Sequence, residues 1–438
     1  MPSEPTPEAA SSTNASERSG AEEKMGGSSA PSSFQEQQQP GVFDRVFWLT
    51  YLANGLTTMA AFMLVRYADF VKLLEGEERQ LGFIVGVGMV GSIVMRLFQG
   101  EAIDRHGAAR VWFWSQLIYT GSLLLHLCLT TAYGPAIFLV RVIMQSSLAG
   151  VFGSSITFVS LRVPASRMAE MIGALGTSGF IGIMLGPLLS DWLSRGDQPL
   201  RTSVDNLFNI SAALAAAAAV AIWFATREMV PPKKRRRPSL WKVVRRYHPW
   251  IISATGAAMG AGFSIPQNFL QPFVEQAHLG GVGIFFLVYA ATAFVARLTS
   301  QPYFERFGNR PWILAGLFLL TLSFLSYIPV TRDWHLVVPA IFAGIAHALL
   351  FPSIIAAGTG FFPRRYLGLS TSLMLAMFDL GTFLGSPIVG AFLFQAKRYT
   401  AAPYAWMFGG TAAAMASVIM LYYWGSSSSH SPSSHVEQ

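Results

Sequence analysis

The sequence predicts an all-α polytopic membrane protein with twelve transmembrane helices, arranged as two six-helix pseudo-repeats. Three observations lead to this fold class. Hydrophobic residues make up 52% of the 438 residues and charged residues only 12%, about half the fraction typical of soluble chains. The charges are confined to short segments between long apolar runs. Landmarks of the first half also recur in the second half at a nearly constant spacing.

Each apolar run has roughly the 20 residues that a helix needs to cross the hydrocarbon core. Lipid offers the backbone no hydrogen-bond partners, so a helix is the expected form, and the short alternating strands of a barrel are not visible. The predicted spans are 46–65, 81–99, 111–131, 135–159, 172–193 and 207–226, then 248–274, 282–299, 312–330, 336–358, 367–395 and 401–424.

The clearest sign of a repeat is the segment Gly100–Arg110, which is charged, contains glycine and is predicted as a tight loop between the second and third spans. Its features return 201 positions later. Trp48 and Trp250 open the first and seventh spans in the same way. The corresponding pairs in and before the loop are Arg96 and Arg297, Asp104 and Glu305, Arg105 and Arg306, and Gly107 and Gly308.

The predicted organisation is two six-helix bundles, residues 43–226 and 248–424, joined by a basic loop over 227–247. Residues 1–42 and 425–438 are polar and rich in serine, which predicts disordered tails. Lys and Arg are concentrated in the loops that would share the side of the two termini, above all around Lys233–Arg237. This bias predicts that both termini are cytoplasmic and that the basic loop contacts anionic lipid.

Three motifs resemble those of the major facilitator superfamily of secondary transporters, over residues 43–424. The loop motif is matched by Gly100, Asp104, Arg105, Gly107 and Arg110, while its second copy has Gln301 in place of the first glycine. Arg141 and Gln145 resemble the motif of the fourth span, with Ser146 in place of glycine. The antiporter motif of the fifth span is matched by Gly182, Gly186 and Pro187, but Ser190-Asp191 replace two glycines.

The resemblance implies a transporter that works by alternating access, with the substrate bound between the halves near the membrane midplane. It is closest to drug- and sugar-efflux proton antiporters. It favours proton-coupled export of a small, amphipathic or sugar-like molecule through the plasma membrane over import. We expect a monomer with a small-molecule substrate, protons and membrane lipid as partners, and no nucleic acid. A membrane sensor without transport activity and a polytopic membrane enzyme are the alternatives from other classes.

The charged loop is predicted to act as a conformational latch, because a carboxylate near helix N-termini can accept hydrogen bonds and ion pairs that hold one face closed. The alternative is an ordinary charged turn, but its repetition in both halves favours the latch. The predicted latch residues are Gly100, Asp104, Arg105, Gly107, Arg110, Arg297, Glu305, Arg306 and Gly308.

Three ionisable residues lie inside predicted spans, where charges are costly and usually face a cavity. Arg141 is predicted to couple protons or to anchor a polar substrate group, unless it extends to the interface. Asp379 and His347 lie at similar depth on consecutive helices, so they could share a proton. The alternatives are a structural hydrogen bond for Asp379 and a core position for His347.

Buried amides need partners, so amide side chains on spans one, four and seven are predicted to face a wet cavity. They are Asn54, Gln145, Gln267, Asn268 and Gln271. Pro266 suggests that the seventh span is broken near Gln267. Phe62, Phe152, Phe263 and Phe269 could add an apolar wall, although phenylalanine in membrane helices more often packs or faces lipid.

No catalytic residues, cofactor or metal site are predicted. The sequence lacks a Walker motif, a His-Glu-x-x-His motif and a Cys/His cluster, so ATP-driven transport and metal chemistry are not expected. Gly86–Gly91 matches Gly-x-Gly-x-x-Gly but lies within a span, with no strand before it. Close helix packing explains it better than a nucleotide does.

Overall fold

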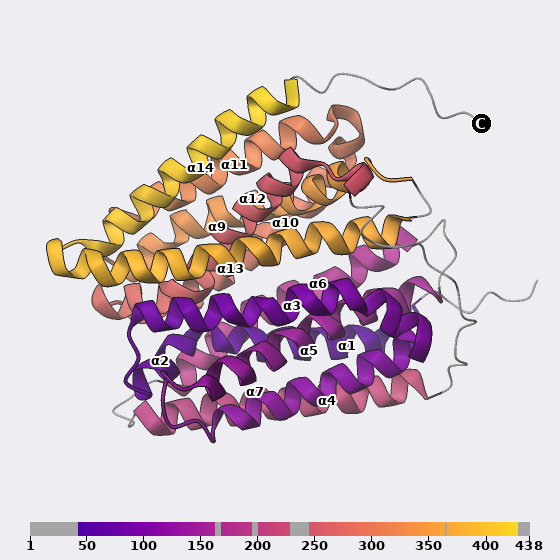
Figure 1. The fold of residues 1–438 in the computed structure, drawn as a ribbon, viewed down its shortest axis with the longest axis horizontal. Helices are drawn as coiled ribbons and strands as arrows, with labels where there is room; N and C mark the ends of the chain where they lie inside the picture. Colours follow the sequence, from indigo (N-terminus) through magenta and orange to yellow (C-terminus); the bar gives the residue numbers. More distant parts are fainter. Residues whose placement is uncertain (1–42, 163–167, 195–199, 228–244, 364–365, 428–438) are drawn as a thin grey trace, which may run out of the picture. The chain divides into compact units, whose positions relative to one another are not determined.

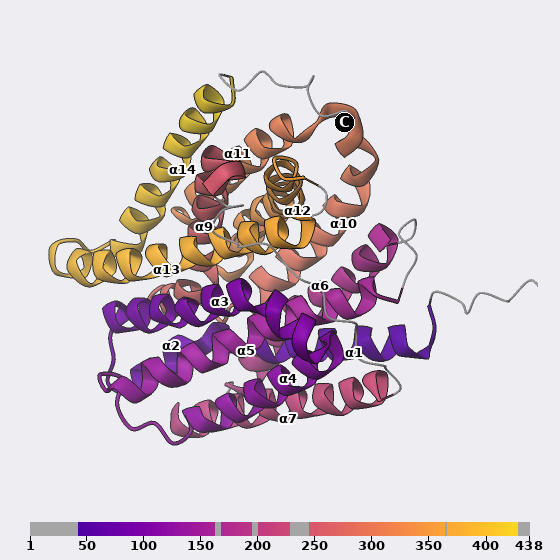
Figure 2. The same cartoon turned by 45° about the vertical axis from the view of Figure 1, so that its right-hand side comes forward.

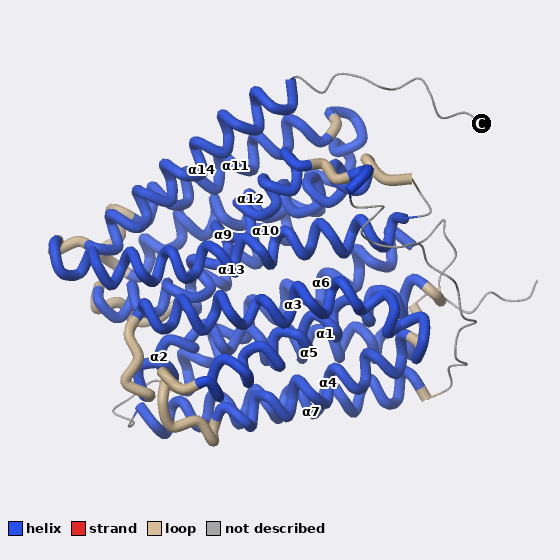
Figure 3. Tube along the Cα trace, viewed as in Figure 1, coloured by secondary structure: helices blue, strands red, loops and turns tan. Residues whose placement is uncertain are grey.

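The computed structural model describes residues 43–162, 168–194, 200–227, 245–363 and 366–427. Nearly all of this part of the chain is helical (Figure 3). The predicted tail 1–42, the basic run Lys233–Arg237 and residues 428–438 lie outside the described residues.

Each predicted span corresponds to a long helix. The first half contains α1 (Arg45–Met63), which continues through η1 (Leu64–Arg66) into α2 (Tyr67–Leu73), then α3 (Glu78–His106), α4 (Ala108–His126), α5 (Pro135–Ser160), α6 (Met168–Leu193) and α7 (Leu200–Thr226). The second half contains α9 (Trp250–Gln276), α10 (Gly283–Phe307), α11 (Asn309–Tyr327), η3 (Asp333–Leu336), α12 (Val337–Thr359), α13 (Leu367–Tyr399) and α14 (Pro403–Ser427).

Among the described residues, 10 helices are long and apolar enough to cross a membrane. The helices α4 and α9 fall short of that limit, because Ser, Thr, Gln and Gly lower the hydropathy of both, together with Arg110 in α4 and two prolines in α9. The described helices α1–α7 gather on one side and α9–α14 on the other, with α3 lying against α13 and α6 against α10 (Figures 1 and 2). The all-α membrane fold is confirmed.

The tight loop predicted over Gly100–Arg110 is wrong in its extent. Helix α3 continues to His106, and only Gly107 interrupts the chain before α4 begins. An ion pair between Arg105 and Glu101, one helical turn apart, supports this extension. Gly107 has a φ of 87°, and Gly308 has a φ of 70° at the same place after α10. Glycine adopts these angles without a steric penalty, which explains why both copies keep it.

The glycines of α3 allow close helix packing. A Cβ at Gly86 would lie 2.5 Å from Cγ of Pro387 on α13, and one at Gly91 would overlap the carbonyl oxygen of Val142 on α5. The Gly86–Gly91 pattern therefore brings α3 close to two neighbouring helices, as its position within a span predicts.

Gly182 and Gly186 pack α6 directly on α1. A Cβ at either position would lie 2.6 Å from a backbone atom of Met59. Pro187 follows inside the same helix. The glycines of the antiporter-like motif thus have a packing role within the first half.

The helix bundle has two ends, which we call the near end and the far end. The near end is where α1 begins and α14 ends, so it carries both ends of the described chain. The far end is the opposite one, where α2 ends at Leu73 and α3 begins at Glu78.

Candidate functional site

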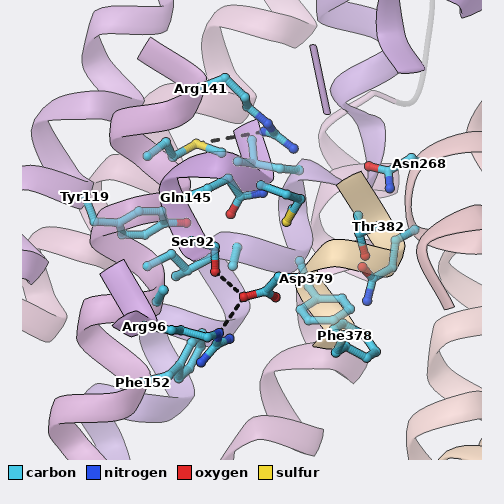
Figure 4. Close-up of a pocket in the computed structure, with 18 of the residues that line it drawn as sticks. Ser92, Arg96, Tyr119, Arg141, Gln145, Phe152, Asn268, Phe378, Asp379 and Thr382 are labelled. Atoms are coloured by element: carbon cyan, nitrogen blue, oxygen red, sulfur yellow. Dashed lines mark hydrogen bonds and ion pairs between the residues drawn. The ribbon is translucent and has the colours of Figure 1, made fainter. Parts of the chain in front are cut away.

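A cavity of about 260 Å³ lies between the two halves. The first half lines it with residues of α1, η1, α3, α4 and α5, and the second half with residues of α9 and α13. Polar side chains from both halves face one another across it (Figure 4). The two helix groups that would move apart in alternating access therefore share one chamber.

Asp379 on α13 joins the two halves at this cavity. Its Oδ2 atom accepts a hydrogen bond from Arg96 Nε at 2.5 Å and another from Ser92 Oγ at 2.6 Å. Both partners belong to α3, one helical turn apart, and Asp379 is only 5% exposed. The charge that the sequence places deep in a span is thus balanced by an arginine of the opposite half.

Arg141 on α5 is buried at the same cavity, with 4% of its surface exposed. Its guanidinium carbon lies 4.1 Å from the centroid of the Tyr67 ring, and Nη1 lies 3.9 Å from the sulfur of Met144. Among the described residues, Nε has no hydrogen-bond partner and no carboxylate forms an ion pair with Arg141. Arg141 is therefore a buried cation that lies on an aromatic face and has no ion-pair partner in the described part of the chain.

Gly88 on α3 leaves room for the side chain of Arg141. A Cβ at Gly88 would lie 2.6 Å from Cγ of Arg141, so the arginine stem lies directly on the glycine. Gly88, Ser92 and Arg96 follow one another at intervals of one turn on α3. Four residues of helix span about 6 Å. Arg141 and Asp379 therefore contact α3 at levels about one turn apart.

Three of the five predicted amides line the cavity: Gln145, Gln267 and Asn268. Asn54 instead donates to Ser178 Oγ at 2.8 Å within the first half. Gln271 lies toward the far end, where its Nε2 is 3.4 Å from Asp69 Oδ1.

Helix α9 is not broken near Gln267, which corrects the expectation drawn from Pro266. It runs continuously from Trp250 to Gln276 with Pro266 inside it. Asn268 supports this part of the helix by donating to the carbonyl oxygen of Ser264 at 2.7 Å. Of the four predicted wall residues, Phe62 and Phe152 line the cavity, whereas Phe263 contacts His347 and Phe269 is buried in the core.

His347 and Asp379 do not form the predicted pair. His347 Nδ1 is hydrogen-bonded to the Tyr289 hydroxyl, and its ring lies among aromatic side chains that include Phe263, 5.1 Å away between centroids. No hydrogen bond joins His347 to Asp379 in the part of the chain that the structure describes. The reason is that α12 packs mainly along α10 and α11, although α13 follows it in sequence.

Besides the hydrogen bond of Gln271 to Asp69, three further contacts join the halves at the far end, and we call these three the far-end clasp. Asp191 Oδ2 on α6 accepts from the backbone N–H of Gly283 on α10 at 2.5 Å. Lys72 pairs with Glu275, and Glu78 pairs with Lys397. Asp191 is also held by Arg66, with 3.1 Å between Oδ1 and Nη1. Each of the three contacts of the clasp joins a helix of the first half to one of the second, whereas Arg66 and Asp191 both belong to the first half.

The predicted latch residues lie toward the near end. Asp104 is half-buried, while Arg105 pairs within its own helix with Glu101. Among the other predicted members, Gly107 is buried, and Gly100 and Arg297 are half-buried. The exposed members are Arg110, Arg306 and Gly308, while the side chain of Glu305 lies outside the described residues. Their role as a latch remains a prediction.

Sequence reasoning missed several residues of this site, although two of them left a signal. Arg96 was visible as the counterpart of Arg297 in the repeat, and Asp191 as a charged residue where the resemblance expects glycine. Ser92 and Tyr119, which line the cavity, have no distinguishing pattern in the sequence. Among the described residues no group of three or more His, Cys, Asp or Glu side chains could hold a metal ion.

Comparison with known proteins agrees with this architecture. The family model of the Major Facilitator Superfamily matches residues 47–301 and 280–438. A protein of Agrobacterium vitis named "Putative tartrate transporter" is 30% identical over 130 residues, which is 29% of this chain and 28% of that protein. The human MFS-type transporter SLC18B1 is 25% identical over 284 residues, or 59% of either chain. The matches thus span between 28% and 59% of these relatives' lengths.

Solved structures show the same fold at low sequence identity. The nucleoside transporter NupG superimposes with a TM-score of 0.69 at 15% identity, covering 87% of this chain and 99% of NupG. A bacterial homologue of the human lysosomal transporter Spinster, in an inward-facing and unoccupied conformation, gives a TM-score of 0.65 at 16% identity, covering 88% and 96%. With a family match that spans both halves and a cavity between them, the chain belongs to the Major Facilitator Superfamily.

Proposed function

We propose that this protein is a proton-coupled secondary transporter of a small organic anion, which binds at Arg141. One observation carries the proposal: Arg141 is a buried cation at the cavity between the halves, without a carboxylate partner among the described residues. A charge at this depth in a membrane protein is costly unless it is paired or faces a water-filled path. An anionic substrate would provide the missing partner.

The charge of the cavity supports an anion over a cation. The ionisable groups that line the cavity are Arg96, Arg141 and Asp379, apart from the tyrosine hydroxyl. Asp379 is paired with Arg96, so the charge of Arg141 remains uncompensated. Two of the partial relatives are named putative tartrate transporters, and tartrate is an organic anion, which supports the proposal.

Proton coupling is assigned to Asp379. Protonation would neutralise its carboxylate and remove the ion pair with Arg96, which joins α3 to α13. Proton binding would then change a contact between the two halves, which is what coupling to alternating access requires. The cavity shared by the two halves and the buried carboxylate thus support one cycle in which anion and proton act on the same interface.

The direction of transport is a separate part of the proposal. Export was predicted from the motif around Gly182, but packing on α1 accounts for that motif's glycines. Export through the plasma membrane, with cytoplasmic termini and a monomeric protein, therefore stays a prediction. Uptake and efflux measured in oriented vesicles would decide the direction.

The proposal is tested in proteoliposomes containing the full chain, with an imposed pH gradient and a panel of radiolabelled solutes. Organic anions such as tartrate should move, and Arg141→Gln should reduce their transport by at least tenfold. Arg201→Gln is the matched control, because Arg201 is exposed and its ion-pair partner among the described residues is Asp205 of its own helix. Wild-type anion transport in Arg141→Gln would refute the proposal, as would gradient-driven movement of neutral or cationic solutes alone. A sensor or an enzyme would move no solute.

A further inference from the structure

We infer that the transported anion is a hydroxylated carboxylate, held with its carboxylate against the first half and its hydroxyl groups against the second. This rests on the proposed function, because it specifies the substrate of the same cavity. Each half presents a different set of hydrogen-bonding groups to the cavity.

The first half presents donors. Tyr119 on α4 lines the cavity, is fully buried, and has a hydroxyl without a hydrogen-bond partner among the described residues. The Nε atom of Arg141 is in the same situation. Figure 4 shows both side chains at the cavity, on either side of Gln145 in that view. A carboxylate has two oxygens and accepts only, so a guanidinium together with a phenol hydroxyl suits it.

Tyr67 does not compete for this role. The face of its ring is occupied by the guanidinium of Arg141, 4.1 Å away, and it does not belong to the cavity lining. Its contribution is to hold Arg141 in place by a cation–π contact. Tyr119 is therefore the tyrosine that is placed to contact the substrate.

The second half presents uncharged amide and hydroxyl groups. Asn268 uses its Nδ2 to donate to the carbonyl oxygen of Ser264, so its Oδ1 remains to accept. Thr382 donates its hydroxyl to the carbonyl oxygen of Gly260 at 3.2 Å, which leaves the oxygen lone pairs. Gln267 adds a second uncharged amide to this side of the lining. Uncharged amide and hydroxyl groups can both donate to and accept from a hydroxyl group, whereas they offer no positive charge to a carboxylate.

The remaining charge of the second half at the cavity is already satisfied. Asp379 accepts from Arg96 and Ser92 of the first half. The cavity, at about 260 Å³, is smaller than a typical drug-binding pocket of roughly 300–1,000 Å³. A short hydroxylated acid with one end charged and the other rich in hydroxyl groups matches this division.

Two matched pairs of probes test the inference in proteoliposomes: gluconate with hexanoate, and tartrate with succinate. The members of each pair have the same number of carbons and carboxylates and differ in hydroxyl groups. For at least one pair, kcat/KM should be roughly tenfold or more higher for the hydroxylated member, because a site built for hydroxyl groups rejects analogues without them. Sorbitol, which has hydroxyl groups and no charge, should not be transported.

The outcomes separate this inference from the proposed function. Equal transport within both pairs, still dependent on Arg141, would overturn the hydroxyl part and leave the organic-anion proposal standing. Sorbitol transport at the gluconate rate would overturn the carboxylate part. If none of the carboxylates moves, both proposals fall.

Single substitutions assign the two sides. Tyr119→Phe should raise KM about tenfold for both members of a transported pair, because it removes a contact to the carboxylate. Gln267→Met should raise KM only for the hydroxylated member. Tyr327→Phe is the control, because Tyr327 is equally buried and its hydroxyl also lacks a partner, yet it stacks on Phe408 outside the cavity lining. An effect of Tyr119→Phe no larger than that of the control would overturn the assigned carboxylate contact.

Discussion

Asp379 Oδ2 and Arg96 Nε lie 2.5 Å apart and belong to opposite halves of the chain. Both side chains are largely buried, so this ion pair is weakly screened by water and salt. It is also the contact through which a proton can act on both halves at once, because neutral Asp379 would no longer hold the charge of Arg96. Much of what can be tested about coupling depends on this pair.

The first prediction concerns the pH dependence of transport. Asp379→Asn keeps the size of the side chain and removes the carboxylate proposed to take up the proton, so the initial rate should lose most of its dependence on pH. Rates in proteoliposomes at matched internal and external pH measure this. Ser92→Ala is the control, because it removes one hydrogen bond to Asp379 and keeps the carboxylate. A wild-type pH profile in Asp379→Asn would assign proton coupling elsewhere.

The second prediction concerns Gly88. A methyl group there would overlap the stem of Arg141, with 2.6 Å to Cγ, and would push the guanidinium out of its place over Tyr67. Gly88→Ala should raise KM for the anion about tenfold, while the protein remains folded. Gly121→Ala on α4 is the matched control, since nothing lies within 4 Å of a Cβ at that position. Unchanged KM in Gly88→Ala would show that the position of Arg141 is not critical.

The third prediction concerns the far-end clasp. Lys72→Glu would place a negative charge next to that of Glu275, and the repulsion should favour opening of the far end. The double variant Lys72→Glu/Glu275→Lys restores opposite charges and should return the protein to the closed form. Asp191→Asn should have a larger effect than either single reversal, because Asp191 is buried and accepts from the backbone of Gly283.

Distances between spin labels can measure this opening. Tyr133 and Trp334 are exposed positions at the far end, one in each half, at 62% and 60% exposure. Cysteines at these two sites, in a Cys128→Ser background, would carry the labels, since Cys128 is exposed. A longer distance in Lys72→Glu that the double variant reverses supports the clasp. Identical distance distributions in all variants would show that the clasp does not control opening of the far end.

The fourth prediction concerns the near end. Asp104→Asn should lower the transport rate while expression stays at the wild-type level, if the charged segment acts as a latch. Glu101→Gln is the comparison variant, because it disturbs only the pair with Arg105 within α3. The measurement is the transport rate normalised to the amount of reconstituted protein. A normal rate in Asp104→Asn would reduce the segment to a charged helix end.

The fold could be predicted because its signals are local in the sequence. The lengths of the apolar runs determine the helices, and the repeat that relates Gly107 to Gly308 determines their arrangement. In the structure both glycines have a positive φ, a conformation that residues with a side chain rarely adopt, and this explains why glycine recurs there. The exact end of α3 was not predicted, because charged residues can continue a helix beyond the apolar run as well as end it.

The partners of the buried charges could not be predicted in the same way. The depth of Asp379 follows from its position in a span, but its partner depends on which helices lie together. His347 was a reasonable candidate because α12 and α13 are consecutive, whereas the closest packing of α13 is against α3 and α9. Arg96 lies 283 residues away in the sequence, so nothing local relates it to Asp379.

The amides illustrate the same limit on one helix. Gln267, Asn268 and Gln271 all lie on α9, yet Gln271 hydrogen-bonds to Asp69 at the far end while its neighbours line the cavity. One turn of helix moves a side chain about 5 Å along the axis. Sequence could place these residues on the right helix, but the level of the cavity is fixed only when the halves meet.

The make-up of the far-end clasp has a consequence for the speed of the transport cycle. Two of its three contacts are ion pairs in which at least one side chain is substantially exposed, and such pairs are worth roughly 0–1 kcal/mol each. A closed state held mainly by weak bonds is a shallow minimum. The state in which the far end is open can then be populated at the level of a few per cent without any ligand. Because the far end would not be sealed by a deep energy well, binding of one small ion or molecule would suffice to reverse the balance there, and turnover would not have to wait for a rare opening of this end.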